Sequence, residues 1–419
     1  MDAAPDVADR RLRFARCAWV LLDWAASSFS TVLITLVVAY VERIVMPHGA
    51  WGFEAGVVWA WMLAAAMLVS ALLVPWTAAW ADRHDALQRA LVASTLVGAG
   101  GLLALAAVPP TARGGVVAAV IAACVGFDVA QVFTGGLLPR VAAGRDADRL
   151  SAWGFAAGYA GGALALVAAT AIVAAHDRFG LDVGGGLRLA FAATAAWWIV
   201  FSLPAAGARF AAAAAPHAAS PGRELAAFAR GLWAADRGSV DGRLASVLAG
   251  AMLALGAIQT AIAQFSSLAL QRFDLDGPAL VRLVLLVQAV ALPGALAVGW
   301  LSTRCGRRPA AAVCLGGWIL VLVLAWFVRS PTDLYGLAVL LALVLGGAQS
   351  VLRAAVAVAA PAGHAGVTFG LLQVGTKLAG CGAGAAFGIL HQVTGVPQAG
   401  LAALVVQLVA AWWLLRRMA

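Results

Sequence analysis

Twelve long apolar segments run through this chain, and very few charged residues interrupt them. Hydrophobic residues make up 63% of the 419 positions, charged residues only 11%, and the mean hydropathy is +0.93. A water-soluble domain of this length needs far more charge on its surface, whereas about 20 apolar residues span a bilayer as a helix. The sequence therefore predicts an all-α integral membrane protein that crosses the membrane many times.

Runs of about 20 residues between polar breaks predict twelve spanning helices. We expect them at about 16–40, 56–80, 90–109, 115–139, 151–175, 188–208, 244–270, 280–301, 310–329, 334–360, 366–390 and 397–415. The longest polar stretch, 209–243, lies between the sixth and seventh helices. It predicts a cytoplasmic linker between an amino-terminal six-helix bundle (1–208) and a carboxy-terminal one (244–419).

Arginines are distributed unevenly between the loops on the two sides of the membrane. With both termini in the cytoplasm, nineteen arginines lie on the cytoplasmic side and seven on the other. Cytoplasmic loops carry the excess of Lys and Arg, so we expect both termini inside. Topology and anionic lipids then account for the net charge of +9 without a nucleic-acid partner. Very low lysine against abundant alanine and arginine indicates a GC-rich bacterial genome, and hence a bacterial inner membrane.

The sequence carries no enzyme motif. It has no phosphate-binding glycine loop, no nucleophile–base constellation and no metal cluster. Its five cysteines are odd in number and no pair has metal-ligand spacing, so we expect no metal and no cofactor. We therefore expect a protein that is not an enzyme, and we expect it to be a monomer.

Glycines recur every four residues in two predicted helices that lie six helices apart. They are Gly154, Gly158 and Gly162 in the fifth helix, and Gly380, Gly384 and Gly388 in the eleventh. Small residues at this spacing let helix backbones approach closely inside a membrane, although glycine-rich helices are common there in any case. The matching positions favour a duplicated bundle in which these glycines lie at helix contacts.

A second repeat lies in the short cytoplasmic turns after the second and eighth helices. Its charged residues are Asp82 and Arg83 in the first copy, and Arg304, Arg307 and Arg308 in the second. With these turns the chain resembles the major facilitator superfamily, whose transporters are built from two six-helix repeats. The second copy has Thr303 where the superfamily pattern usually has aspartate. The resemblance implies that these residues form ion pairs at a cytoplasmic gate.

Short polar and glycine motifs lie in five of the predicted helices: Asp23-Trp-Ala-Ala-Ser27 in the first, Ala257-Ile-Gln-Thr260 in the seventh, Gln288, Pro293 and Gly294 in the eighth, Arg353 in the tenth and Lys377 in the eleventh. In these motifs the chain resembles the vacuole-effluxer-like branch, which includes an autophagy-related amino-acid effluxer and bacterial relatives. That branch typically has Asp-Trp-Ala-Asn-Ser in the first helix and Gly-Val-Gln-Thr in the seventh, so the resemblance there is partial. Gly256 stands where the family often has an acidic residue. The resemblance implies a transporter related to amino-acid effluxers.

Four ionisable groups lie away from the ends of the predicted helices: Asp23, Asp128, Arg353 and Lys377. An ionised group at the bilayer centre costs about 2.5–3.5 kcal/mol on insertion scales, so each should face the bundle interior and find a partner. The two acids lie in the first half and the two bases in the second. They could form structural pairs between the halves, or they could line a pathway for a zwitterionic solute, which needs both signs.

Each of these groups has more than one interpretation. Asp23 could begin a polar face of the first helix, or it could form an ion pair or a helix cap near its cytoplasmic third. Asp128 could exchange a proton during transport, because burial disfavours the charged carboxylate, or it could stay paired to Arg353 or Lys377. Lys377 could bind a substrate carboxylate or act as a fixed counter-charge. Arg353 cannot deprotonate, which favours a gate or a structural ion pair.

Polar side chains accompany these charges on single helix faces. Ser27 follows Asp23 by four residues, and Gln131 follows Asp128 by three. In the seventh helix the polar residues are Gln259, Thr260 and Gln264. The first, fourth, seventh and tenth helices line the cavity in the fold that the resemblance implies, so these faces could form a binding wall or only bond helices together.

Two classes of function remain open. The first is a secondary active transporter that moves a small polar or zwitterionic, amino-acid-like solute by alternating access, with protons as one candidate for the coupling ion. The second is a transport-inactive membrane scaffold or sensor built on the same fold. The buried charges favour a transporter, because a pure scaffold has no need to bear their cost.

Overall fold

The computed structural model describes residues 3–212, 230, 240–272, 277–394 and 399–416. Each of the twelve segments expected to be helical overlaps a helix. Among the described residues, ten helices are long and apolar enough to cross a membrane, and Ala399–Leu415 is a shorter apolar helix. The chain is thus an all-helical, multi-pass membrane protein.

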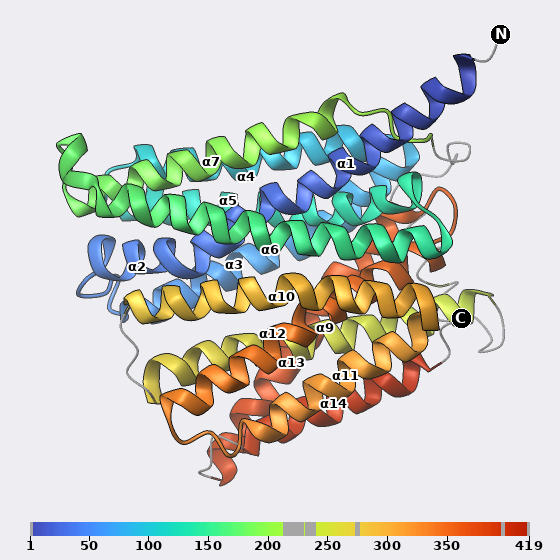
Figure 1. The fold of residues 1–419 in the computed structure, drawn as a ribbon. Coiled ribbons are helices and arrows are strands. Elements are labelled where there is room, and N and C mark those ends of the chain that lie inside the picture. Colours follow the sequence, from blue (N-terminus) through green and yellow to red (C-terminus); the bar gives the residue numbers. More distant parts are fainter. Residues whose placement is uncertain (1–2, 213–229, 231–239, 273–276, 395–398, 417–419) are drawn as a thin grey trace.

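The first half of the chain forms one group of helices (Figure 1). They are α1 (Ala3–Val32), extended by η1 (Leu33–Val37), α2 (Val38–Tyr40) and η2 (Val41–Val45), then α3 (Ala55–Arg83), α4 (Leu87–Ala107), α5 (Arg113–Val141), α6 (Gly144–Ala174), η3 (His176–Phe179) and α7 (Val183–Gly207). The η1 and η2 segments are π-helical turns within one continuous rod. Helices α1 and α6 pack along each other, as do α4 and α5.

The second half forms another group, drawn yellow to red in Figure 1. Its helices are α9 (Val240–Arg272), α10 (Gly277–Cys305), α11 (Arg307–Leu324), α12 (Pro331–Ala359), α13 (Ala365–Thr394) and α14 (Ala399–Leu415). Helix α10 lies beside α6, and α13 lies beside α3 and α5, so these pairs join the two halves. Most of the expected linker, 213–229 and 231–239, lies outside the described residues.

Helix α1 begins and α14 ends at the same end of the bundle, which we call the terminal end (Figure 1). Glycines make two of the sharp turns there. Gly144 (φ 54°) is the first residue of α6, and Gly306 (φ 95°) is the single residue between α10 and α11. These left-handed conformations are disfavoured for residues with a Cβ, so glycine allows the chain to reverse within so short a connection.

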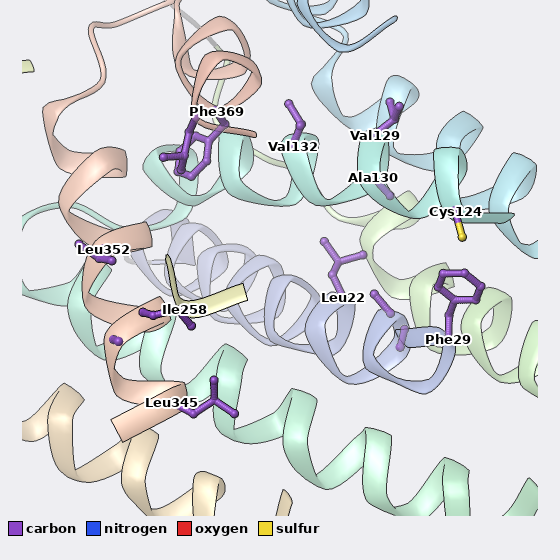
Figure 2. Packing of buried hydrophobic residues seen from close by; sticks show 14 of the residues in the cluster. Leu22, Phe29, Cys124, Val129, Ala130, Val132, Ile258, Leu345, Leu352 and Phe369 are labelled. Atoms are coloured by element: carbon purple, nitrogen blue, oxygen red, sulfur yellow. The ribbon is translucent and has the colours of Figure 1, made fainter. Parts of the chain in front are cut away.

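The core is apolar and continuous between neighbouring helices. Figure 2 shows Leu22 and Phe29 on α1 beside the residues of α5 around Cys124 and Ala130. It also shows Phe369 of α13 near the terminal half of α5, where a Cβ built at Gly135 would overlap its ring. Small residues on α5 therefore allow the second half to approach the first closely near the terminal end.

Candidate functional site

An ion pair joins Asp23 of α1 to Arg353 of α12. The guanidinium Nη1 donates to Oδ1 at 2.9 Å, and Nη2 lies 2.7 Å from Oδ2, which gives a two-point contact. The side chains are only 6% and 11% exposed. Oδ2 is close to Nη2 but accepts no hydrogen bond from a described residue, so the contact is one charge-assisted hydrogen bond and a second close charge contact. It connects the first half of the chain to the second.

The rest of the arginine is held by α6 and by aromatic rings. Its Nε donates to the Ser151 hydroxyl at 3.0 Å, and Nη2 donates to the Ser151 carbonyl at 3.0 Å. The guanidinium carbon lies 4.6 Å from the Trp19 ring centre and 4.2 Å from that of Phe155. These contacts fix the side chain of Arg353 from several directions, so it is preorganised to meet Asp23.

A second ion pair joins Asp128, near the middle of α5, to Lys377 of α13. The Lys377 Nζ donates to Oδ2 at 2.8 Å, and the two side chains are 11% and 13% exposed. Ser70 of α3 donates to the same oxygen at 2.8 Å. Gln373, one turn before Lys377, donates to Oδ1 at 3.2 Å. The carboxylate thus lies where α3, α5 and α13 meet, and both of its oxygens accept hydrogen bonds.

The two pairs follow one electrostatic pattern, since the first half supplies each acid and the second half each base. Pairing offsets the cost of burying these charges in a membrane. Removing one partner of a buried pair leaves the other charge uncompensated, which typically costs about 3–5 kcal/mol. The pairs are therefore energetically coupled to whether the two halves are in contact.

Two further polar contacts connect the halves at the terminal end. Asp82, at the end of α3, accepts hydrogen bonds from the backbone N–H groups of Gly366 (2.9 Å) and Val367 (2.7 Å) in the first turn of α13. A carboxylate is stabilised there by the unpaired N–H groups and the helix dipole. Arg307, at the start of α11, donates through Nε to Asp148 of α6 at 2.8 Å, and the Asp148 side chain is 1% exposed.

The other expected gate residues differ from this pattern. The guanidinium of Arg304 lies 4.7 Å from the ring centre of Trp300, on its own helix. Arg83 is half-buried and Arg308 is exposed, and no polar contact joins either side chain to another described residue. Of the basic residues in the two turns, Arg307 is the one whose described contacts reach the other half.

The polar residues expected beside the charges lie in several environments. The Gln131 Oε1 is buried and has no hydrogen-bond partner among the described atoms. Gln259 is exposed, whereas the Thr260 hydroxyl donates to the carbonyl of Gly380 on α13 at 3.1 Å. Ser27 faces α6, where a Cβ built at Gly158 would lie 2.7 Å from its hydroxyl. The side chain of Gln264 lies outside the described residues.

The glycines of α6 lie where this helix meets α1. A Cβ built at Gly154 would overlap Asp23 and lie 2.7 Å from Nη2 of Arg353, so glycine leaves the space that the ion pair occupies. One built at Gly162 would lie 2.6 Å from both the Thr31 hydroxyl and the Gln288 amide nitrogen. Those two groups form a hydrogen bond of 2.9 Å between α1 and α10.

The glycines of α13 differ from the expectation of a matching series of helix contacts. Gly380 lies close to α9, because a Cβ built at Gly256 would lie 2.7 Å from its backbone nitrogen. A Cβ built at Gly384 or Gly388 would have no described atom within 4 Å. The three glycines have the same four-residue spacing as those of α6, but only Gly380 contacts another described helix. The close approach at Gly256 also leaves little room for the acidic side chain that the family often has there.

Four of the residues that hold these charges were not expected from the sequence: Ser70, Gln373, Asp148 and Ser151. A signal for three of them was present. Asp148, Ser151 and Phe155 recur at spacings of three and four residues on one helical face, and Gln373 precedes Lys377 by four residues. Ser70 stands in an otherwise apolar stretch, and a lone polar residue of this kind commonly bonds helices together.

Comparison with known proteins shows the family and the fold. Residues 58–418 match the family model described as vacuole effluxer Atg22 like, which is more than half of the chain. An uncharacterized MFS-type transporter of Bacillus subtilis (strain 168), YxiO, is 24% identical over 395 residues, which are 93% of this chain and 91% of that protein.

Two solved structures with the same architecture cover nearly the whole chain. The E. coli fucose:proton symporter FucP has a TM-score of 0.74 at 11% identity, with 97% of this chain and 98% of that chain covered. The human organic anion transporter MFSD10 (TETRAN) has a TM-score of 0.70 at 16% identity, with 97% and 99% covered. At such identities the likeness shows the fold alone, which is that of the major facilitator superfamily.

Proposed function

The chain belongs to the Atg22-like vacuole effluxer family of MFS-type transporters, and on this premise we propose that it is a secondary active transporter for a small polar or zwitterionic solute. The solute is amino-acid-like, carrying an ammonium and a carboxylate. Transport proceeds by alternating access, in which the two halves rock about a site near the middle of the membrane.

The observation that carries this proposal is the contact between Asp128 and Lys377. An acid and a base from different halves lie 2.8 Å apart in the middle of the bundle, next to the hydrogen-bonding side chains of Ser70 and Gln373. Asp128 can receive a substrate ammonium and Lys377 a substrate carboxylate. A zwitterion that replaces the ion pair leaves the total charge of the buried site unchanged, whereas a net-charged solute adds an uncompensated charge.

The contacts between the halves support alternating access. They run from the terminal end, at Asp82 and Arg307, through Asp23 and Arg353 to the hydrogen bond of Gln288 near the middle of the bundle. This arrangement fits a state in which the terminal end is closed. Opening that end requires these contacts to break, which links solute movement to a rearrangement of the two halves.

We place the protein in a bacterial cell membrane with the terminal end facing the cytoplasm. The arginine-rich segments, including the turns after α3 and α10, lie at this end of the bundle. The excess of Arg on cytoplasmic loops supports this orientation. Cysteine-accessibility mapping of exposed positions such as Arg89 and Arg113, at opposite ends, tests it, and labelling of Arg89→Cys from outside intact cells contradicts it.

Counterflow in proteoliposomes tests the transport function. Proteoliposomes that contain the purified protein are loaded with a pool of amino acids and small organic ions, and uptake is followed with and without a pH gradient. We expect Lys377→Ala to weaken exchange under all gradients, because the site then lacks a cation for the substrate carboxylate. If protons drive transport through Asp128, Asp128→Asn abolishes pH-driven uptake and preserves exchange, since an amide keeps hydrogen bonding but does not titrate.

The matched control is Asp146→Asn, which removes an exposed acid whose partner Arg16 lies in the same half. It should leave exchange unchanged. If Asp128→Asn and Lys377→Ala both transport like the wild type and only unfold more readily, the buried pair is structural. If the wild type exchanges none of the solutes, the result favours a scaffold or sensor.

A further inference from the structure

A basic hollow lies at the terminal end between α1 and the end of α7. Its volume is about 480 Å³, and it is lined by Arg10, Arg11, Phe14, Gly207 and Arg209. The two helices lie side by side, and α1 continues past the bundle at this end (Figure 1). The hollow therefore lies near the level at which the helices leave the apolar part of a membrane.

Two of the three guanidinium groups are available to an external anion. Arg13 and Arg16 on the same helix form ion pairs with Asp9 and Asp146. By contrast, Arg11 and Arg209 are exposed and form no polar contact with another described residue. Planar guanidinium groups bind phosphate oxygens in pairs of parallel hydrogen bonds, so these two residues suit a phosphate group.

The surface next to the hollow is apolar on the side toward the middle of the membrane. Val200 and Leu203 on α7 are 55% and 58% exposed, and with Gly207 they recur at spacings of three and four residues on one face. Phe14 on α1 is 51% exposed. A stripe of exposed apolar side chains thus leads along α7 directly to the arginines.

We propose that this hollow binds the headgroup of an anionic phospholipid, with the phosphate between Arg11 and Arg209 and an acyl chain along Val200 and Leu203. Charge complementarity and the apolar stripe together match a molecule with a phosphate at one end and a hydrocarbon chain at the other. Basic pockets at the edge of a membrane bundle are a known mode of headgroup binding. A free anion satisfies the arginines but leaves the stripe unused.

Thermal unfolding of the full-length protein in detergent tests the site. The protein is titrated with dioctanoyl phosphatidylglycerol, dioctanoyl phosphatidylcholine or inorganic phosphate, and the unfolding midpoint is followed. We expect a saturable rise with phosphatidylglycerol and a much smaller one with the other two. A basic residue near an anionic lipid surface contributes on the order of 1 kcal/mol, so each arginine lost should weaken the apparent affinity about fivefold.

The central variant is Arg11→Gln/Arg209→Gln, for which we expect the apparent affinity for phosphatidylglycerol to fall roughly 25-fold. Its matched control is Arg145→Gln/Arg149→Gln, which removes two exposed arginines of α6 at the same end. A second variant, Gly207→Phe, fills the hollow and leaves every charge in place. It should fold, because a Cβ built at Gly207 meets no described atom within 4 Å.

The proposal is supported if the central variant and Gly207→Phe both lose the phosphatidylglycerol response while the control keeps it. Equal losses in the control overturn it, because net charge alone then accounts for the effect. An equal rise of the unfolding midpoint with phosphatidylcholine also overturns it, since the site then binds the acyl chains of any phospholipid. An equal rise with phosphate at the same concentration overturns it as well, since the site then binds a free anion. The readout is the shift relative to the same variant without lipid, so a lower starting midpoint does not affect the comparison.

Discussion

Replacing Asp23 with asparagine should release the terminal end of the bundle. Asparagine has nearly the same shape and keeps Oδ1 as an acceptor for Nη1 of Arg353, but it places an amide where Oδ2 now lies 2.7 Å from Nη2. At least one charge-assisted contact is lost, and such contacts are worth about 1.5–3 kcal/mol net. Arg353 keeps its bonds to Ser151, so the effect should fall on the contact between the halves.

The magnitude follows from the position of the pair. Because the pair forms only when the two halves meet, its loss changes the equilibrium between the closed and open terminal ends. A change of 1.5–3 kcal/mol corresponds to roughly a 10- to 150-fold shift toward the open form. The side chains of Asp23 and Arg353 are only 6% and 11% exposed, so solvent and salt screen their interaction much less than that of a surface pair.

Distances between spin labels measure this shift. Labels at Arg89→Cys on α4 and Arg308→Cys on α11 lie on exposed positions of different halves at the terminal end, in a background without the five native cysteines. We expect the longer distances to gain population in Asp23→Asn. The control Asp146→Asn breaks an exposed pair within the first half, and exposed pairs contribute only about 0–1 kcal/mol.

The reasoning is refuted by an unchanged distance distribution in Asp23→Asn, because the pair then does not hold the halves together. An equal change in Asp146→Asn also refutes it, since loss of any acid at this end would then suffice. Arg353→Lys should give an intermediate shift, because an ammonium keeps the charge but not the two-point contact.

Three further contacts can be tested by substitution. Asp82→Asn puts an amide donor in place of one of the two oxygens that accept from the first turn of α13, which loses a charge-assisted hydrogen bond worth about 1.5–3 kcal/mol, so the same spin labels should show an opening of roughly 10- to 150-fold. Gln288→Leu removes one hydrogen bond to Thr31, and such bonds average about 0.6 kcal/mol in membranes, so we expect only about a threefold shift. Gly154→Ala should lower the unfolding temperature, because its methyl group overlaps the ion pair at a typical cost of about 1–3 kcal/mol, whereas Gly384→Ala in open space should leave it unchanged or raise it.

The positions of the spanning helices could be predicted from the sequence with useful accuracy. Hydropathy is a local property, so the limits of segments such as 115–139 lie close to those of α5, Arg113–Val141. The same holds for the family, because residues such as Arg353 and Lys377 stand where the pattern of that family has them, and residues 58–418 match its model. Helices at the terminal end extend further than expected, since α1 begins at Ala3 within a polar stretch that need not lie in the membrane.

The partners of the buried charges could not be predicted. The cost of burial required Asp128 to find a counter-charge, but that cost is the same for Arg353 and Lys377. Which base is reached depends on the rotation and height of α5 relative to α12 and α13, which no single segment encodes. The glycines of α6 and α13 differ for the same reason, because identical spacing meets a neighbouring helix at Gly158 and open space at Gly384.

By itself, then, the sequence determined that the chain crosses a membrane many times, which family it resembles, and that acids lie in the first half and bases in the second. These properties follow from hydropathy and residue identity, which act position by position. The tertiary structure alone decided that Asp23 pairs with Arg353 and Asp128 with Lys377, and that Ser70 and Gln373 complete the second contact. Those pairings join residues up to 330 positions apart, so they depend on how whole helices pack against each other.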